Sequence, residues 1–175
     1  NGQVLLENAL KEYERSNYQL SIKLLEECVS SGECDKSKAY MMLGANYCMT
    51  FDYFKSKLNL TNSLNLDSSN FKVYFYFGKV YLYEGFNSTA IKYFNKSIII
   101  NKDNANSYNY RAIAKIRNND YEGAIVDENI AIQIDSTITV TDLEGTSYDS
   151  GYVTFSITQN KESEDKLSIL IPLSI

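Results

Sequence analysis

The stretch Phe71–Asn101, FKVYFYFGKVYLYEGFNSTAIKYFNKSIIIN, contains two runs of apolar residues with helical spacing. One face of the first run, at i, i+3, i+4 and i+7, carries Tyr74, Phe77, Gly78 and Tyr81. The matching face of the second run carries Ala90, Ile91, Phe94, Ser97 and Ile98. Because this spacing is typical of amphipathic helices and a short turn at 84–86 separates the runs, the stretch predicts a helical hairpin.

Small residues mark where the two helices of the hairpin should touch. Gly78 and Ala90 lie midway along their helices, and small side chains let two backbones approach closely. The hairpin recurs at a step of 34 residues. The downstream copy has Tyr108, Ala112, Tyr121 and Ala124 in register. The upstream copy has Tyr40, Leu43, Gly44, Tyr47 and Ser56. A weaker copy, at a step of 35, has Leu5, Ala9, Tyr18, Ser21, Leu25 and Cys28.

This period and pattern resemble the tetratricopeptide repeat (TPR) family. The family's aromatic and small positions match Tyr74, Gly78, Tyr81 and Ala90, and again Tyr108, Ala112 and Ala124. The last repeat departs at Lys115 and Glu128, where aromatic residues are usual. The family's helix-ending proline is replaced by Ser68, Lys102 and Ser136. The resemblance implies a mainly α fold, a right-handed solenoid of about four repeats over residues 1–135.

The pattern predicts eight helices in the repeat region. They are expected at 2–15, 18–30, 36–49, 52–66, 70–84, 87–100, 104–118 and 121–134. Stacked repeats touch only their neighbours, so both ends of such an array are expected to expose an unfilled packing face.

After residue 135 the hydrophobic period changes from 3.6 to 2. The alternation predicts a small antiparallel β segment over residues 136–175, with strands at 137–141, 152–158 and 167–175. The last strand has one apolar face, formed by Leu167, Ile169, Ile171, Leu173 and Ile175. We expect this face to be buried against protein, because exposing it would lose about 1.5–3 kcal/mol for each side chain.

The resemblance also implies which residues line the concave surface of the solenoid. Those positions fall on Met41, Met42, Ala45, Cys48, Met49, Phe75, Tyr76, Lys79, Leu82, Tyr83, Asn109, Tyr110, Ile113, Ile116 and Arg117. The expected partner-binding residues among them are Met41, Met42, Met49, Phe75, Tyr76, Leu82, Tyr83, Tyr110, Ile113 and Ile116. In the alternative interpretation, some of these side chains face the core. The positions that form a carboxylate clamp in chaperone-binding family members keep only Lys72 here, which disfavours that function.

Composition argues against several classes of function. The chain has no His, the usual proton shuttle and the commonest metal ligand, so we expect neither an enzyme nor a metal or cofactor site. A net charge of −5 disfavours nucleic-acid partners. No run of 18 apolar residues is present, so no membrane span is expected.

Cysteines and glycosylation motifs bear on the compartment. Cys28 and Cys34 flank the longer turn between the first two repeats, where a disulfide would indicate an oxidising, extracellular or cell-surface location. If Cys28 is instead a buried thiol, a cytoplasmic location is the alternative. Three N-x-S/T motifs begin at Asn59, Asn87 and Asn95, a number that chance alone would produce.

Two functions are compatible with these features, and both involve protein partners. The favoured hypothesis is a self-assembling structural subunit, a filament or other homo-oligomer, because open solenoid ends, an apolar groove and an apolar terminal strand all need cover. The alternative is an adaptor that binds a peptide of another protein in its apolar concave groove. If the strands cap their own last repeat, the chain is a monomer and the adaptor is favoured.

Overall fold

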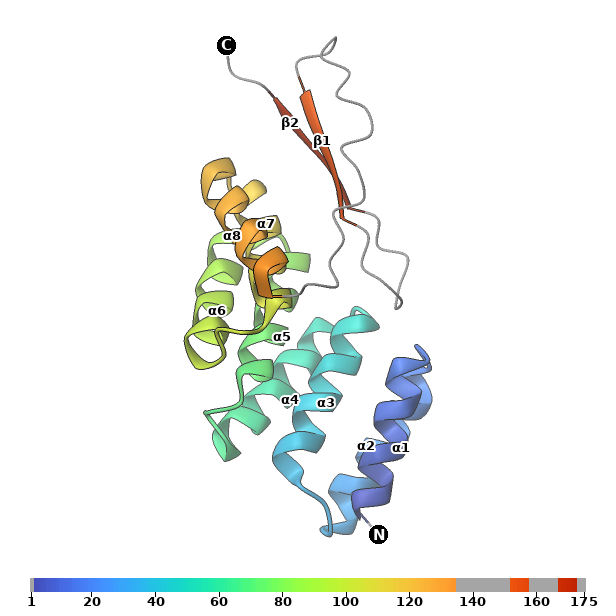
Figure 1. Ribbon diagram of the computed structural model, residues 1–175. Coiled ribbons are helices and arrows are strands. Elements are labelled where there is room, and N and C mark those ends of the chain that lie inside the picture. The colour runs from blue at the N-terminus through green and yellow to red at the C-terminus, as the bar shows by residue number, and fades with distance from the viewer. Residues whose placement is uncertain (1, 135–151, 158–166, 173–175) are drawn as a thin grey trace.

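The computed structural model describes residues 2–134, 152–157 and 167–172. Within these ranges the chain forms eight helices and two strands (Figure 1). The helices are α1 (Gly2–Glu14), α2 (Tyr18–Ser31), α3 (Lys36–Met49), α4 (Tyr53–Leu66), α5 (Phe71–Tyr83), α6 (Asn87–Ile100), α7 (Ala105–Ile116) and α8 (Tyr121–Ile134). The strands are β1 (Tyr152–Ile157) and β2 (Leu167–Pro172).

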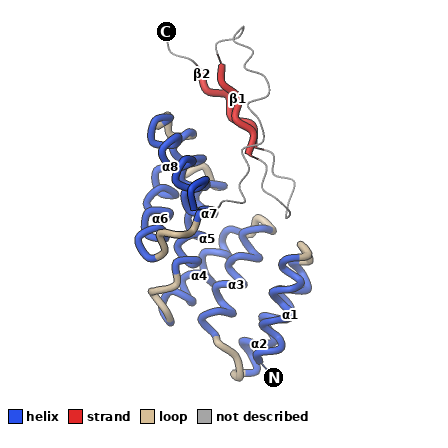
Figure 2. Tube along the Cα trace, viewed as in Figure 1, coloured by secondary structure: helices blue, strands red, loops and turns tan. Residues whose placement is uncertain are grey.

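Consecutive helices pack as antiparallel hairpins, which stack side by side (Figure 2). The odd-numbered helices α1, α3, α5 and α7 also contact one another in that order, whereas the even-numbered helices contact the odd-numbered ones. We call the odd-numbered helices the inner layer. The described helices therefore have the mainly α, TPR-like architecture that the repeat pattern predicts.

Side chains at the helix starts explain why the helices begin where they do. Asp35, Asp52, Asn70 and Asn104 each accept a hydrogen bond from a backbone N–H in the first turn of the helix that follows. Such caps satisfy amide groups that have no partner within the helix. At the end of α2, Gly32 has φ +73°, a left-handed conformation that glycine adopts without strain.

Close approach between paired helices fixes the hairpin geometry. A Cβ atom on Gly78 would lie 2.5 Å from the ring of Phe94, so only glycine fits there without movement. In the first two repeats the small residue of the second helix is a serine that donates to the facing helix. Ser21 Oγ donates to the Ala9 carbonyl at 2.8 Å, and Ser56 Oγ donates to the Gly44 carbonyl at 2.7 Å. These contacts give the repeats the register that the sequence predicts.

The strands β1 and β2 pair antiparallel, with Tyr152 opposite Pro172 and Ile157 opposite Leu167. The expected strand at 137–141 lies outside the described residues, and so do Leu173 and Ile175. The burial of the apolar face that also includes Ile169 and Ile171 stays a prediction, as does the three-stranded tail.

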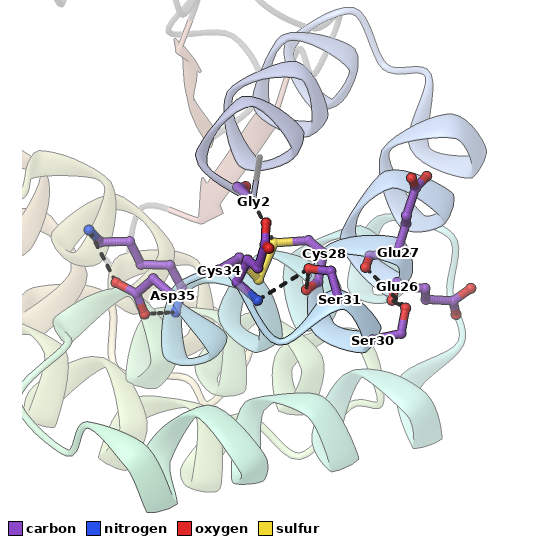
Figure 3. The surroundings of a disulfide bond; sticks show 10 residues. Gly2, Glu26, Glu27, Cys28, Ser30, Ser31, Cys34 and Asp35 are labelled. Carbon is purple, nitrogen blue, oxygen red and sulfur yellow. Dashed lines mark hydrogen bonds and ion pairs between the residues drawn. A yellow bond between two sulfur atoms is a disulfide. The ribbon is translucent and has the colours of Figure 1, made fainter.

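A disulfide joins Cys28, in the last turn of α2, to Cys34 in the following turn, with their Cα atoms 5.7 Å apart (Figure 3). The start of α1 packs on this turn, because a Cβ on Gly2 would lie 2.5 Å from the Glu33 carbonyl oxygen. The bond therefore lies where α1, α2 and the approach to α3 meet. The third cysteine, Cys48, is a buried free thiol.

The hairpin register predicts the effect of enlarging Ala90. Ala90 is fully buried beside Phe94 and Leu82, so Ala90→Leu should overpack this contact and lower the free energy of unfolding by about 1–3 kcal/mol. Lys92→Leu, at an exposed position of the same helix, is the control. Denaturant unfolding measures both, and equal midpoints for the two variants would contradict the register.

The disulfide predicts the thiol content of the protein isolated without reductant. A titration in denaturant should find one free thiol, Cys48, and reduction should release the other two. Replacing Cys28 and Cys34 by serine should lower stability by about 2 kcal/mol, because the short loop would no longer be closed in the unfolded chain. Three free thiols before reduction would show that the bond does not form.

Candidate functional site

A buried lysine lies among aromatic rings in the inner layer. Lys79 of α5 is only 6% exposed. Its Nζ lies 4.7 Å from the ring centre of Tyr110, 5.7 Å from that of Tyr83, 5.9 Å from that of Phe75 and 6.0 Å from that of Tyr76. A cation within about 6 Å of a ring face is attracted by the ring's electrons. We call Lys79 and these four rings the Lys79 cluster.

All four inner helices contribute to the surroundings of this cluster. From α3, Met49 accepts a weak hydrogen bond from Lys79 Nζ, with the nitrogen 3.7 Å from its Sδ. From α1, the Tyr13 hydroxyl lies 3.2 Å from that of Tyr76. From α7, Tyr110 packs edge-on against Phe75 with ring centres 5.4 Å apart. The cluster thus ties together helices from the first repeat to the last.

The surroundings of Lys79 favour its charged form. Burial acts to lower the pKa of Lys79, but its neighbours Tyr110, Tyr83, Cys48 and Tyr13 act in the other direction, and the pKa is raised above its ordinary value. Burial also raises the pKa of Tyr76 to about 12 and that of the Cys48 thiol to about 11. At neutral pH the charged Lys79 therefore lies near the neutral phenol of Tyr76 and the neutral thiol of Cys48.

No carboxylate among the described residues pairs with this cation. The inner helices α3, α5 and α7 contain no Asp or Glu. Their basic residues are Lys36, Lys38, Lys72, Lys79, Arg111 and Lys115. These three inner helices are therefore locally positive in a chain whose net charge is −5, whereas the fourth inner helix, α1, contains three glutamates and one lysine.

The structure separates the ten residues expected to line the concave surface into two groups. Half-buried side chains that keep part of their surface exposed are Met42, Met49, Phe75, Tyr76, Tyr83, Tyr110, Ile113 and Ile116. Met41 and Leu82 are buried instead, so the expectation that they line an open surface is wrong. Met41 packs against Leu60 and Val73, and Leu82 packs against Ala114, because both positions face the next repeat.

The last repeat replaces the usual aromatic contacts with ion pairs. Arg111 donates from Nε and Nη2 to the two carboxylate oxygens of Asp127, at 2.8 and 2.5 Å. Lys115 Nζ lies 2.8 Å from the same carboxylate, which is 1% exposed. Arg111 also donates from Nη1 to Asn95 Oδ1 at 2.7 Å, which links the network to the preceding repeat.

Polar side chains occupy several packing positions of the first and last repeats. The α1 positions that correspond to the buried Leu43 and Asn46 of α3 are Asn8 and Lys11, and both are exposed. At the other end, Lys115 and Glu128 stand where the preceding repeat has Tyr81 and Phe94. Apolar side chains are also exposed on these two repeats, Val4 and Leu10 on α1 and Ile125 and Val126 on α8, so the expectation of open packing faces stays a prediction.

Sequence reasoning included Lys79 among the concave positions but missed its isolation from acidic groups. The available signal was local, since Lys79 interrupts the apolar run from Val73 to Tyr83. The sequence also showed that Lys115 and Glu128 replace the usual aromatic residues of the repeat, but it did not identify Asp127 as their neighbour. No local signal marks Asp127.

The three glycosylation motifs lie in helices. The side-chain nitrogen of Asn59 donates to the Lys55 carbonyl at 2.8 Å, and that of Asn87 donates to the Arg117 carbonyl at 3.2 Å. Asn95 is half-buried and bonded to Arg111 through its side-chain oxygen. Glycosylation at these residues stays a prediction.

The described residues lack the features of two other classes of site. No helix among them is both long and apolar enough to span a bilayer. Within the same ranges, no group of three or more Cys, Asp and Glu side chains is placed to hold a metal ion.

Solved structures share this fold at low sequence identity. A TPR protein from Thermus thermophilus, TTC0263, matches with a TM-score of 0.71 and 15% identity over 78% of this chain and 76% of its own. A crystal structure of MamA matches with a TM-score of 0.64 and 20% identity over 78% of this chain and 79% of its own. No protein-family model matches the sequence. No curated protein matches it either.

The pKa of Glu128 predicts a pH-dependent effect on stability. Burial and the neighbouring Asp127 raise the pKa of Glu128 to about 7 from its ordinary value of 4.5. The stabilisation from the protonated acid is therefore present below the unfolded pKa and lost as pH rises through about 7. Glu128→Gln, which mimics the protonated acid, should stabilise the protein at about pH 8, and the gain should shrink toward about pH 5.

Thermal unfolding at the two pH values measures this effect. Glu122→Gln, at an exposed position of the same helix, is the control and should show no such pH-dependent gain. A Glu128→Gln variant whose stability relative to wild type is the same at both pH values would contradict the shifted pKa.

Proposed function

We propose that this chain is a non-catalytic protein-interaction scaffold that binds a segment of another protein against its inner layer. The observation that best supports this proposal is the Lys79 cluster, in which aromatic side chains from α5 and α7 surround one cation. Tyr and Trp rings with a polar tip are favoured at protein interfaces because they supply contact area at low entropic cost.

The chemistry of the site supports a binding role over a catalytic one. Its only thiol, Cys48, has a raised pKa and stays protonated at neutral pH, so it lacks the thiolate that nucleophilic catalysis needs. The TPR-fold neighbours agree with a scaffold role at the level of fold. The polar residues at both ends of the helical array, such as Lys11 and Lys115, favour partner binding over end-to-end stacking.

A matched pair of alanine variants tests the inner layer as the binding surface. Peptides selected from a random library on the wild-type chain should bind Tyr83→Ala about tenfold or more weakly, because a half-buried contact ring is lost. Phe54→Ala removes a ring of similar size from the exposed surface of α4, where Phe54 is 77% exposed. It should bind these peptides like wild type.

Fluorescence anisotropy with the selected peptides gives both affinities. Equal weakening by the two variants, or loss with Phe54→Ala alone, would contradict binding at the inner layer. Circular dichroism on each variant checks that the helices remain folded.

Self-assembly is the second candidate, and two observations favour it. Among the described residues β1 and β2 pair only with each other, and a two-stranded pair leaves edges that could accept a strand from another copy. On α8, Ile125 and Val126 are 46% and 56% exposed. Removing residues 166–175 should then leave the helices folded by circular dichroism and abolish any oligomer. An oligomer that persists would remove this candidate.

An extracellular or cell-surface location is part of the proposal. The pairing of Cys28 with Cys34 supports it, because structural disulfides are rare in the reducing cytosol. A cytoplasmic location is the alternative, and three free thiols in the isolated protein would favour it.

A further inference from the structure

The ammonium of Lys79 has unused hydrogen-bonding capacity. It carries three N–H donors, and its hydrogen-bond partner among the described residues is the Met49 sulfur, a weak acceptor. The surrounding rings stabilise its charge but accept no strong hydrogen bond through their faces. Buried charges in proteins are ordinarily paired with an opposite charge. The cluster is therefore an incomplete electrostatic site.

Other basic side chains near the inner layer either have partners or are exposed to solvent. Arg111 and Lys115 are bound to Asp127, and Arg117 donates to the Leu82 carbonyl at 3.2 Å. Lys72, on the same helix as Lys79, is exposed to solvent. The Lys79 cluster thus offers a single uncompensated positive charge. A carboxylate monoanion would balance this charge, whereas a phosphate dianion would need a second cation.

A second polar side chain in the same layer is also unpaired. Asn109, which precedes Tyr110 on α7, is 5% exposed, and neither its amide nitrogen nor its amide oxygen has a partner in the described part of the chain. An amide offers one acceptor and two donors, which match the N–H and C=O groups of an extended peptide. The inner layer therefore lacks a counterion at α5 and a hydrogen-bonding partner at α7.

We infer that the segment bound by the inner layer is acidic and that an Asp or Glu side chain of it pairs with Lys79. The carboxylate would replace the Met49 sulfur as the acceptor, and the unbranched Met49 side chain can move aside. This inference rests on the proposed function and adds the chemistry of the partner. The occupant is a peptide segment because four rings from two helices offer contact area far beyond one small anion.

Two synthetic peptides of equal length, with blocked termini, test the inference. One alternates Glu with Gly and the other alternates Gln with Gly, so that they differ only in side-chain charge. The wild-type chain should bind the Glu peptide about tenfold or more tightly, measured by fluorescence anisotropy at low salt. Lys79→Met keeps the apolar stem and should abolish this preference, while Lys79→Arg should retain it.

Lys72→Met is the matched control, because it removes the same charge from an exposed position of the same helix. It should change the Glu-peptide affinity by less than about threefold. Lys79→Met should fold like wild type, since replacing an unpaired buried charge with an apolar side chain is often neutral or stabilising. If Lys79→Met fails to fold, the ¹⁵N NMR signal of the Lys79 ammonium in the wild-type chain serves as the measurement instead. This signal should shift when the Glu peptide is added and should not shift when the Gln peptide is added.

The outcomes separate this inference from the proposed function. No preference for the Glu peptide, or a preference that survives Lys79→Met, would overturn the acidic partner. If library peptides then still bind in a Tyr83-dependent way, the scaffold function stands alone. If acetate displaces the Glu peptide at the same concentration of carboxylate groups, the ligand is a small anion and not a peptide. If the wild-type chain self-associates and Lys79→Met does not, the partner at Lys79 is a second copy of this chain.

Discussion

The close contact between paired helices at small residues is the constraint on which the rest of the structure depends. Gly78 lies directly against the Phe94 ring, and Ser21 and Ser56 hydrogen-bond to the backbone of the facing helix. These contacts set the distance and rotation within each hairpin, so the same positions of the first helices fall in one layer. Lys79 and Tyr110 can approach within 4.7 Å only because α5 and α7 present corresponding faces.

The fold could be predicted from sequence because its determinants are local and repeated. A small residue in each helix and a step of 34 or 35 residues place each hairpin without knowledge of distant contacts, and in the two middle repeats a tyrosine follows the small residue three positions on. The predicted and observed helix boundaries agree within two residues. The helix α7 ends at Ile116, two residues earlier than predicted, and Asn119 in the turn that follows has a left-handed φ of +62°. The surroundings of Lys79 were less predictable, because Met49 comes from 30 residues away and burial depends on how successive repeats stack. Met41 and Leu82 were misplaced for the same reason.

The last repeat has charged side chains at positions where the preceding repeat has aromatic ones. The carboxylate of Asp127 is buried but fully compensated by Arg111 and Lys115, so it contributes no unpaired charge. Replacing such a network with apolar residues is often neutral or stabilising in isolated proteins. Here the network joins α7 to α8 and, through Asn95, to α6. Under the proposed function, the aromatic inner layer is the surface that binds the partner.

The most direct test of this account is the mass of the intact chain in solution, measured by light scattering after size-exclusion chromatography at two concentrations. A scaffold that binds partners through its inner layer, with polar ends, predicts a monomer of 19.9 kDa at both. A mass that rises with concentration would contradict the account and favour the self-assembling subunit instead.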